Sequence, residues 1–163
     1  MKVVSYTILA ILFLVFFSAL NFKNTGYDIL DYPIRAFYHA NMSHLIANAI
    51  SFWSLSFIEE AMGSGRFLFA MVFIWLVSSM ILLLIHKLFP SRKVYTVGFS
   101  GVIFGLIVIY YTLLNQGPGI TLAGLILSIV PQLAVPGISF EGHLSGIIAG
   151  ILYVIIFPIK RVK

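Results

Sequence analysis

Five polar side chains interrupt stretches of sequence that are otherwise almost entirely apolar: His39, His44, Asn48, Ser100 and His143. A serine hydroxyl becomes a nucleophile when a neighbouring imidazole accepts its proton, so Ser100 and His143 could together attack an amide. The oxyanion formed by that attack needs hydrogen-bond donors already in place, and His44 and Asn48 carry suitable ones. These residues lie far apart in the chain, so this chemistry depends on the elements that bring them together.

The composition of the chain indicates a membrane protein. Of its 163 residues, 61% are hydrophobic and only 9% are charged, and the mean hydropathy is +1.07. These charges are too few to cover the surface of a soluble domain. The long apolar runs are continuous rather than alternating, which favours helices over a barrel, and a helix satisfies its own backbone polar groups in lipid. We therefore predict an all-α, polytopic membrane protein.

The hydrophobic runs predict six transmembrane helices in one domain over residues 1–163. We interpret the first run as a retained span, because it is longer than a signal-peptide core and residues 21–23 (NFK) make a poor cleavage site. Five Lys and Arg residues fall on each predicted side, so charge does not decide the orientation, and the basic C-terminal tail favours cytoplasmic termini. The predicted spans cover about residues 3–20, 39–58, 67–86, 98–114, 120–135 and 142–157.

Alternate spans run in the same direction, so the second, fourth and sixth all begin on one face of the membrane. This places the five polar side chains at similar depths on one side. His44 and Asn48 are four residues apart and share a helical face, whereas His39 and His44 are five apart and should turn well away from each other. That spacing argues against a zinc pair on this helix, and we expect no metal or other cofactor.

Glycines predict close packing of the fourth and sixth spans. Small residues four apart let helix backbones approach closely in lipid, and this approach would bring Ser100 within hydrogen-bond reach of His143. The start of the fourth span also offers the backbone N–H of Ser100 to an oxyanion. Glu141, two residues from His143, should point elsewhere, so we expect a dyad and not a triad. The glycines with this spacing are Gly101, Gly105, Gly142, Gly146 and Gly150.

Two short motifs surround these polar side chains, at residues 39–48 (HANMSHLIAN) and residues 98–101 (GFSG). They look like the rhomboid H-x4-H-x3-N signature and the rhomboid G-x-S-G nucleophile motif. The chain therefore resembles the rhomboid intramembrane serine proteases of the minimal six-helix prokaryotic type. Residues 143–150 (HLSGIIAG) are similar to the family's last core helix, and residues 63–67 (GSGRF) resemble the turn after its second helix. Together these motifs touch the chain from about residue 35 to 150, in the family's order.

The resemblance implies a hydrolase that cleaves transmembrane segments of other proteins, without metal or ATP. It implies Ser100 as nucleophile, His143 as base, and His44 and Asn48 as oxyanion donors. The expected partners are transmembrane protein substrates and membrane lipids, with no nucleic acid, in a multi-pass protein of the cell (plasma) membrane. Substrates would enter from lipid between spans two and five, near residues 131–137. Supporting residues are His39, Gly98, Gly101, Phe104, Gly146 and Gly150.

Two departures from the family pattern accompany the resemblance. Many members have a tyrosine one turn after the serine, stacked on the catalytic histidine, and here that residue is Phe104. The first loop also lacks a Trp-Arg pair common in the family. The main alternative is a non-catalytic rhomboid-like scaffold that binds transmembrane clients, although such proteins typically lack the serine or the histidine. A small transporter is a third reading, but it would place charged residues in the span interiors, which hold none.

Overall fold

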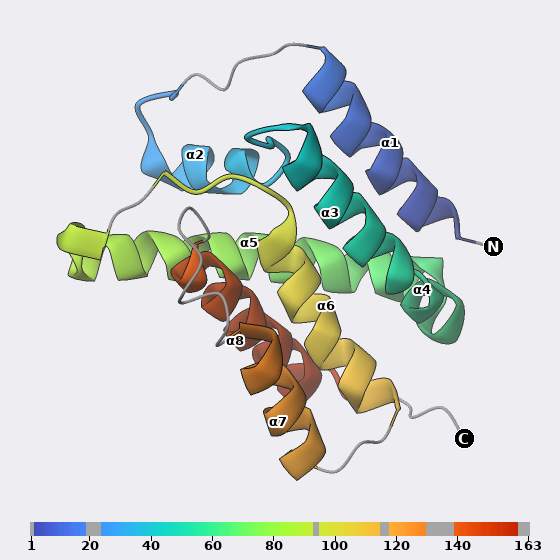
Figure 1. Cartoon of the computed structure of the whole chain (residues 1–163). Coiled ribbons are helices and arrows are strands. Elements are labelled where there is room, and N and C mark those ends of the chain that lie inside the picture. Colours follow the sequence, from blue (N-terminus) through green and yellow to red (C-terminus); the bar gives the residue numbers. More distant parts are fainter. Residues whose placement is uncertain (1, 19–23, 93–94, 115–117, 130–138, 160–163) are drawn as a thin grey trace.

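The computed structural model describes residues 2–18, 24–92, 95–114, 118–129 and 139–159. Within these residues all regular structure is helical, which confirms the predicted all-α class (Figure 1). A short 3-10 turn, Pro90–Arg92, follows the longest helix. The helices are α1 (Val3–Phe17), α2 (Asp28–Arg35), α3 (Met42–Ser54), α4 (Phe57–Met62), α5 (Ser64–Leu88), α6 (Ser100–Leu113), α7 (Pro118–Ile129) and α8 (Phe140–Ile156).

Helices α3, α6 and α8 run in the same direction, and α5 runs against them (Figure 1). Helix α8 packs most extensively on α6 and next on α5. We call the end of the bundle at which α3, α6 and α8 begin the site face. The opposite end, at which α1 begins and α8 ends, is the terminal face. The predicted common direction of the second, fourth and sixth apolar runs is therefore present in the structure.

The predicted second span, about residues 39–58, does not coincide with a single helix. Its helix α3 begins only at Met42, because the side chain of Asn41 caps it by accepting a hydrogen bond from the backbone N–H of His44. After Ser54 the chain tightens into a turn in which the N–H of Ser56 bonds to the carbonyl of Trp53 at 3.0 Å. The short helix α4 then follows separately.

The predicted polar connection after the first span contains a helix, α2, which sequence analysis missed. Asp28 and Asp31 lie in its first turn, where negative charge is favoured by the helix dipole. The indole Nε1 of Trp75 on α5 donates a hydrogen bond of 2.8 Å to the carbonyl of Pro33 in α2. Helix α2 therefore lies against α5 and is part of the bundle.

Only one described helix, α5, is both long and apolar enough to cross a membrane by itself. It extends the predicted span of residues 67–86 by about a turn, and α1, α6 and α8 are shorter apolar helices. Helix α7 covers the first part of the predicted fifth span. The rest of that span and residues 131–137, predicted as part of a lateral gate, lie outside the described residues, as do residues 19–20 of the first span.

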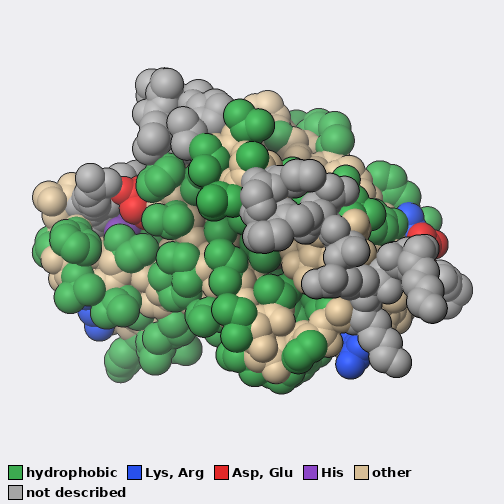
Figure 2. Space-filling view, turned by 90° about the horizontal axis from the view of Figure 1, so that it is seen from below, with side chains coloured by type: hydrophobic (Ala, Val, Ile, Leu, Met, Phe, Trp, Pro, Cys, Tyr) green, Lys and Arg blue, Asp and Glu red, His purple; other side chains and the backbone are tan. Residues whose placement is uncertain are grey.

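Apolar side chains cover much of the outer surface. In Figure 2 they occupy the middle of the view, and charged side chains lie toward its left and right ends. Soluble monomers rarely expose contiguous apolar surface on this scale, whereas a lipid-facing belt requires it. Strongly exposed examples from four helices are Leu14 (68%), Leu84 (55%), Leu127 (73%) and Ile155 (69%).

Candidate active site

Ser100 and His143 meet at the site face, each in the first turn of its helix. Ser100 is the first residue of α6, and His143 lies in the first turn of α8. The Nε2 atom of His143 is 2.8 Å from the Oγ atom of Ser100, which is hydrogen-bond distance. The structure thus brings together, across 43 residues of sequence, the hydroxyl and imidazole that the sequence analysis paired.

Glycine contacts between α6 and α8 set this distance. A Cβ atom at Gly146 would overlap the carbonyl oxygen of Gly101, and one at Gly105 would lie 2.9 Å from the carbonyl oxygen of Gly146. One turn further along α8, a Cβ atom at Gly150 would lie 2.5 Å from the carbonyl oxygen of Gly105. These are backbone contacts, so a side chain at these positions could not be accommodated by a rotamer change. The predicted close approach of the two helices is confirmed.

Phe104 lies one turn after Ser100 and stacks on the imidazole of His143. The ring centroids are 4.3 Å apart and the rings are inclined by 18°. Both side chains are buried, with 8% of each exposed. The phenyl ring therefore restricts the imidazole to the plane in which Nε2 faces Ser100. The aromatic support that the sequence analysis attributed to Phe104 has the required geometry.

The extended segment before Ser100 is fixed by hydrogen bonds to two other elements. The N–H of Gly98 donates to the carbonyl oxygen of Arg35 at the end of α2, at 3.1 Å. The Oγ1 atom of Thr96 donates to Oγ of Ser139, the N-cap residue of α8, at 3.1 Å. Ser100 is therefore positioned by α2 and α8 as well as by its own helix.

Gly98 is required by both its backbone conformation and its surroundings. Its φ angle is +111°, a region that side chains disfavour. A Cβ atom there would stand 2.7 Å from Cε1 and 2.8 Å from Nε2 of His44. The His44 imidazole thus lies directly against the backbone two residues before Ser100, at the same site face.

Asn48 lies one turn below His44 on α3 and is buried. Its amide nitrogen donates to the carbonyl oxygen of His44 at 2.9 Å, which fixes the side chain. Its Oδ1 atom is buried without a hydrogen-bond partner among the described residues. One amide proton of Asn48 remains for another acceptor, because its nitrogen carries two.

The backbone at the start of α6 offers further donors. The first N–H groups of a helix have no partner within it. In the described part of the chain, the N–H groups of Ser100 and Gly101 make no backbone hydrogen bond. The N–H of Ser100 and the side chains of His44 and Asn48 are the donors that were predicted from the sequence for an oxyanion; the N–H of Gly101 was not among them.

The predicted separation of His39 and His44 is wrong. Their ring centroids are 5.1 Å apart at an interplanar angle of 69°. The helical spacing argument fails because His39 precedes the helix, which begins at Met42 after the Asn41 cap. His39 therefore packs edge-on against the ring of His44, and both rings lie close to Gly98. Among the described residues, no three His, Asp or Glu side chains come close enough to form a metal site.

Sequence analysis missed a small cavity beside the serine. It has a volume of about 40 Å³ and is lined by Ser78 and Ser79 of α5 together with Ser100 and Gly101. Ser78 and Ser79 both donate hydrogen bonds to the carbonyl oxygen of Trp75. The two adjacent serines in the middle of an apolar helix were the available signal. The cavity has serine hydroxyls in its wall and is large enough to hold water next to the hydroxyl of Ser100.

Comparisons with known proteins identify the family. The profile of the rhomboid domain matches residues 28–160. A protein of Acanthamoeba polyphaga mimivirus that is named as a rhomboid protein is 57% identical over 161 residues, which are 99% of this chain and 94% of that protein. The name of the mimivirus protein states no measured activity.

Two further relatives are more distant and longer. The mitochondrial rhomboid-like protein 14 of Arabidopsis thaliana is 38% identical over 146 residues, which are 77% of this chain but 42% of that protein. An uncharacterised protein of Mycobacterium bovis is 30% identical over 140 residues, covering 77% of this chain and 58% of that protein. With a profile match over most of its length and a close relative that it covers almost completely, the chain belongs to the rhomboid family.

Proposed function

We propose that this protein is an intramembrane serine endopeptidase that cleaves transmembrane segments of other membrane proteins. The observation that carries the proposal is the 2.8 Å contact between Nε2 of His143 and Oγ of Ser100. The rhomboid family is membrane-embedded and includes serine proteases. A serine and a histidine held at this distance on two rigid helices are suited to acyl transfer.

The proposed reaction has two stages. His143 accepts the proton of Ser100 while Oγ attacks the substrate carbonyl, and the resulting imidazolium then donates that proton to the leaving amine. Water next attacks the acyl-enzyme with His143 again acting as base. We propose that a Ser-His dyad carries out both stages, and Phe104 helps to orient the imidazole by stacking on it.

We assign the oxyanion to donors that converge on the site face. These are the side chains of His44 and Asn48 and the backbone N–H of Ser100. Two observations support the assignment. His44 lies against Gly98, two residues before Ser100. The amide nitrogen of Asn48 uses one of its two protons to bond to the carbonyl oxygen of His44, so the second proton is available to the oxyanion. Removing one such donor typically lowers kcat by about 100- to 1,000-fold.

We further propose the setting in which the reaction takes place. The chain forms one six-span domain over residues 1–163 of a multi-pass protein of the cell membrane, with both termini cytoplasmic. Its substrates are transmembrane proteins that arrive laterally from the lipid, between α3 and α7. This route is supported by the apolar outer surface, which leaves lipid as the surroundings of the bundle.

Cleavage of single-span reporter proteins in liposomes tests the proposal. A panel of reporters with different transmembrane sequences is reconstituted with wild-type protein or with the Ser100→Ala and His143→Ala variants. We expect fragments from at least one reporter with wild type, and none with either variant while both keep wild-type thermal unfolding. Stable binding of reporters without any cleavage by wild type would instead support a non-catalytic scaffold.

A further inference from the structure

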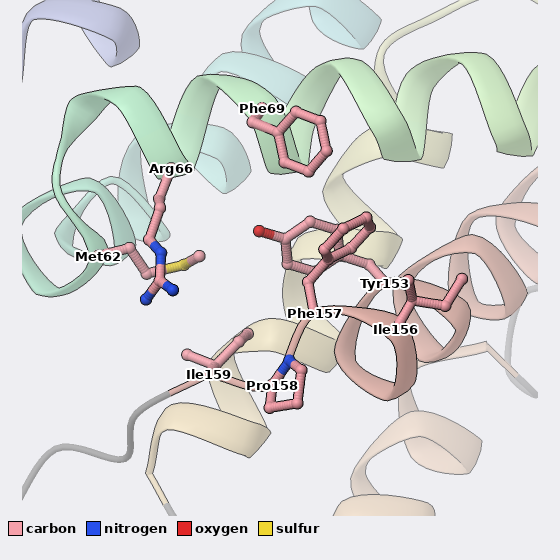
Figure 3. A pocket seen from close by; sticks show the side chains of 8 residues that line it. All are labelled: Met62, Arg66, Phe69, Tyr153, Ile156, Phe157, Pro158 and Ile159. Carbon is pink, nitrogen blue, oxygen red and sulfur yellow. The ribbon is translucent and has the colours of Figure 1, made fainter.

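A pocket at the terminal face lies at the opposite end of the bundle from Ser100. It has a volume of about 360 Å³ and opens between the start of α5 and the end of α8 (Figure 3). Its lining combines one cation, Arg66, with apolar side chains that include Phe69, Ile156 and Ile159. The dyad, its supporting residues and the proposed substrate path make no use of this pocket.

The guanidinium of Arg66 has no carboxylate partner among the described residues. Two acids lie near it in sequence, and both are engaged elsewhere. Glu59 accepts hydrogen bonds from Val4, Ser5 and Ser64, and Glu60 pairs with Lys2 at 3.6 Å. Arg66 therefore presents an unneutralised positive charge and a planar set of donors suited to an oxyanion such as phosphate.

The second polar group of the pocket is the hydroxyl of Tyr153. The tyrosine is only 2% exposed, yet its hydroxyl points into the pocket on the side of Arg66 (Figure 3). Within the residues that the structure describes, no hydrogen bond reaches this hydroxyl. The hydroxyl is therefore available as a hydrogen-bond donor to a ligand atom between Tyr153 and Arg66.

The remaining walls of the pocket are apolar and open toward the outside of the bundle. Phe69 is 49% exposed and Ile156 is 55% exposed. Phe69 also packs on Phe157 and Tyr153, with centroid distances of 5.0 and 6.2 Å, which keeps the aromatic wall rigid. A ligand that fits this pocket thus has a negatively charged head and a hydrocarbon portion.

We propose that the pocket binds the phosphate group of an anionic phospholipid. Arg66 forms the ion pair with the phosphate, Tyr153 donates a hydrogen bond to it, and the start of an acyl chain lies over Phe69 and Ile156. An anionic lipid is favoured over a zwitterionic one because the C-terminal residues of the chain carry positive charge. Three cations follow Ile159 in the sequence, namely Lys160, Arg161 and Lys163.

Native mass spectrometry of the full-length protein in detergent tests this proposal independently of proteolysis. Phosphatidylglycerol, phosphatidylcholine and inorganic phosphate are titrated separately into the wild type and three variants. Arg66→Gln removes the cation and Tyr153→Phe removes only the hydroxyl. Lys87→Gln is the matched control, because it removes an exposed cation from the same helix at the site face.

The expected result is one tightly retained phosphatidylglycerol on the wild type and on Lys87→Gln. We expect Arg66→Gln to weaken this binding by at least about tenfold, and Tyr153→Phe by about three- to tenfold. Equal binding of phosphatidylcholine, or an Arg66→Gln variant that retains phosphatidylglycerol as well as wild type does, would overturn the proposal. Binding of inorganic phosphate as tight as that of the lipid would overturn the assignment to a lipid.

Discussion

The carbonyl oxygen of Gly101 occupies the space in which a Cβ atom would stand at Gly146. These two residues follow Ser100 and His143 by one and three positions, so the closest backbone contact between α6 and α8 lies directly beneath the dyad. The distance between the hydroxyl and the imidazole is therefore set by backbone packing and not by side-chain choice. Any atom added between these helices should therefore change the distance between the Ser100 hydroxyl and the His143 imidazole.

The variant Gly146→Ala tests this dependence. The added methyl group forces α8 away from α6, since neither backbone can move aside locally. We expect a loss of about 1–3 kcal/mol in the free energy of unfolding and a loss of reporter cleavage larger than the unfolded fraction explains. Thermal unfolding and cleavage are measured on the same sample.

Gly65→Ala is the matched control for that substitution. Gly65 is also helical, but no atom lies within 4 Å of a Cβ built there. Alanine is the better helix former by about 0.5–1 kcal/mol, so this variant should be as stable as the wild type or more so. Full activity of Gly146→Ala would show that the helix contact does not set the dyad.

Phe104 should act through the ring that it stacks on His143. Phe104→Leu keeps most of the apolar volume but removes the aromatic contact, worth about 0.5–1.5 kcal/mol. We expect kcat/KM for a cleaved reporter to fall by about two- to tenfold, and Phe104→Tyr to stay close to wild type. If Leu and Tyr variants cleave equally fast, the ring does not orient the imidazole.

Glu59 fixes the start of α1 to the rest of the bundle. Its carboxylate accepts hydrogen bonds from the N–H groups of Val4 and Ser5 at 2.9 and 2.8 Å, and from the hydroxyls of Ser5 and Ser64, both at 2.7 Å. Glu59→Gln replaces one carboxylate oxygen by an NH₂ group, which cannot accept the hydrogen bonds that these N–H and O–H groups donate. The substitution should lower the free energy of unfolding by about 1–3 kcal/mol.

Glu60→Gln separates this effect from charge alone. Glu60 is half exposed, and among the described residues it pairs only with Lys2, an interaction worth about 0–1 kcal/mol. Unfolding of both variants in a denaturing detergent series should therefore give a clearly lower midpoint for Glu59→Gln. Similar midpoints for the two variants would contradict the role given to the buried carboxylate.

Asp31 should make the first loop sensitive to acid. The N–H of Thr25 bonds to its carboxylate at 2.9 Å, and this hydrogen bond holds the pKa of Asp31 below its ordinary value. A pKa that is lower in the folded state stabilises the fold at neutral pH, and this stabilisation disappears as the pH falls through the folded value.

The corresponding test is thermal unfolding of Asp31→Asn across pH. The variant should unfold at lower temperature than wild type at pH 7, and the difference should shrink as the pH falls below the ordinary pKa of an aspartate. Asp28→Asn is the control on the same helical turn, and it should show a smaller difference. A gap between Asp31→Asn and wild type that persists in acid would contradict the assigned hydrogen bond.

The polar residues of the site could be predicted from the sequence because they are costly in lipid and therefore rare there. Ser100 and His143 stand out against apolar neighbours, and glycines at a spacing of four show which helices approach each other. Their depth follows from the 1.5 Å rise of a helix. These are local rules, and the structure agrees with the one that concerns glycine spacing, because α6 and α8 touch at these glycines.

Features outside the regular helices were not predictable in this way. The contact between His39 and His44 depends on the Asn41 cap, which starts the helix three residues later than the apolar run suggested. Helix α2 forms because Trp75 and other residues of α5 pack against it, and its own eight residues are too short to be stable alone. The terminal pocket joins residues about 90 positions apart, which no periodicity reveals.

Labelling with a fluorophosphonate probe tests the central claim, an activated Ser100, most directly. The purified wild type, Ser100→Ala and His143→Ala are treated in detergent, and the modified residue is located by peptide mass spectrometry. We predict phosphonylation of wild type at Ser100 and its loss in both variants, which should unfold at the wild-type temperature. A folded wild type that is not labelled at Ser100, or a His143→Ala variant labelled as fast as wild type, would contradict the account.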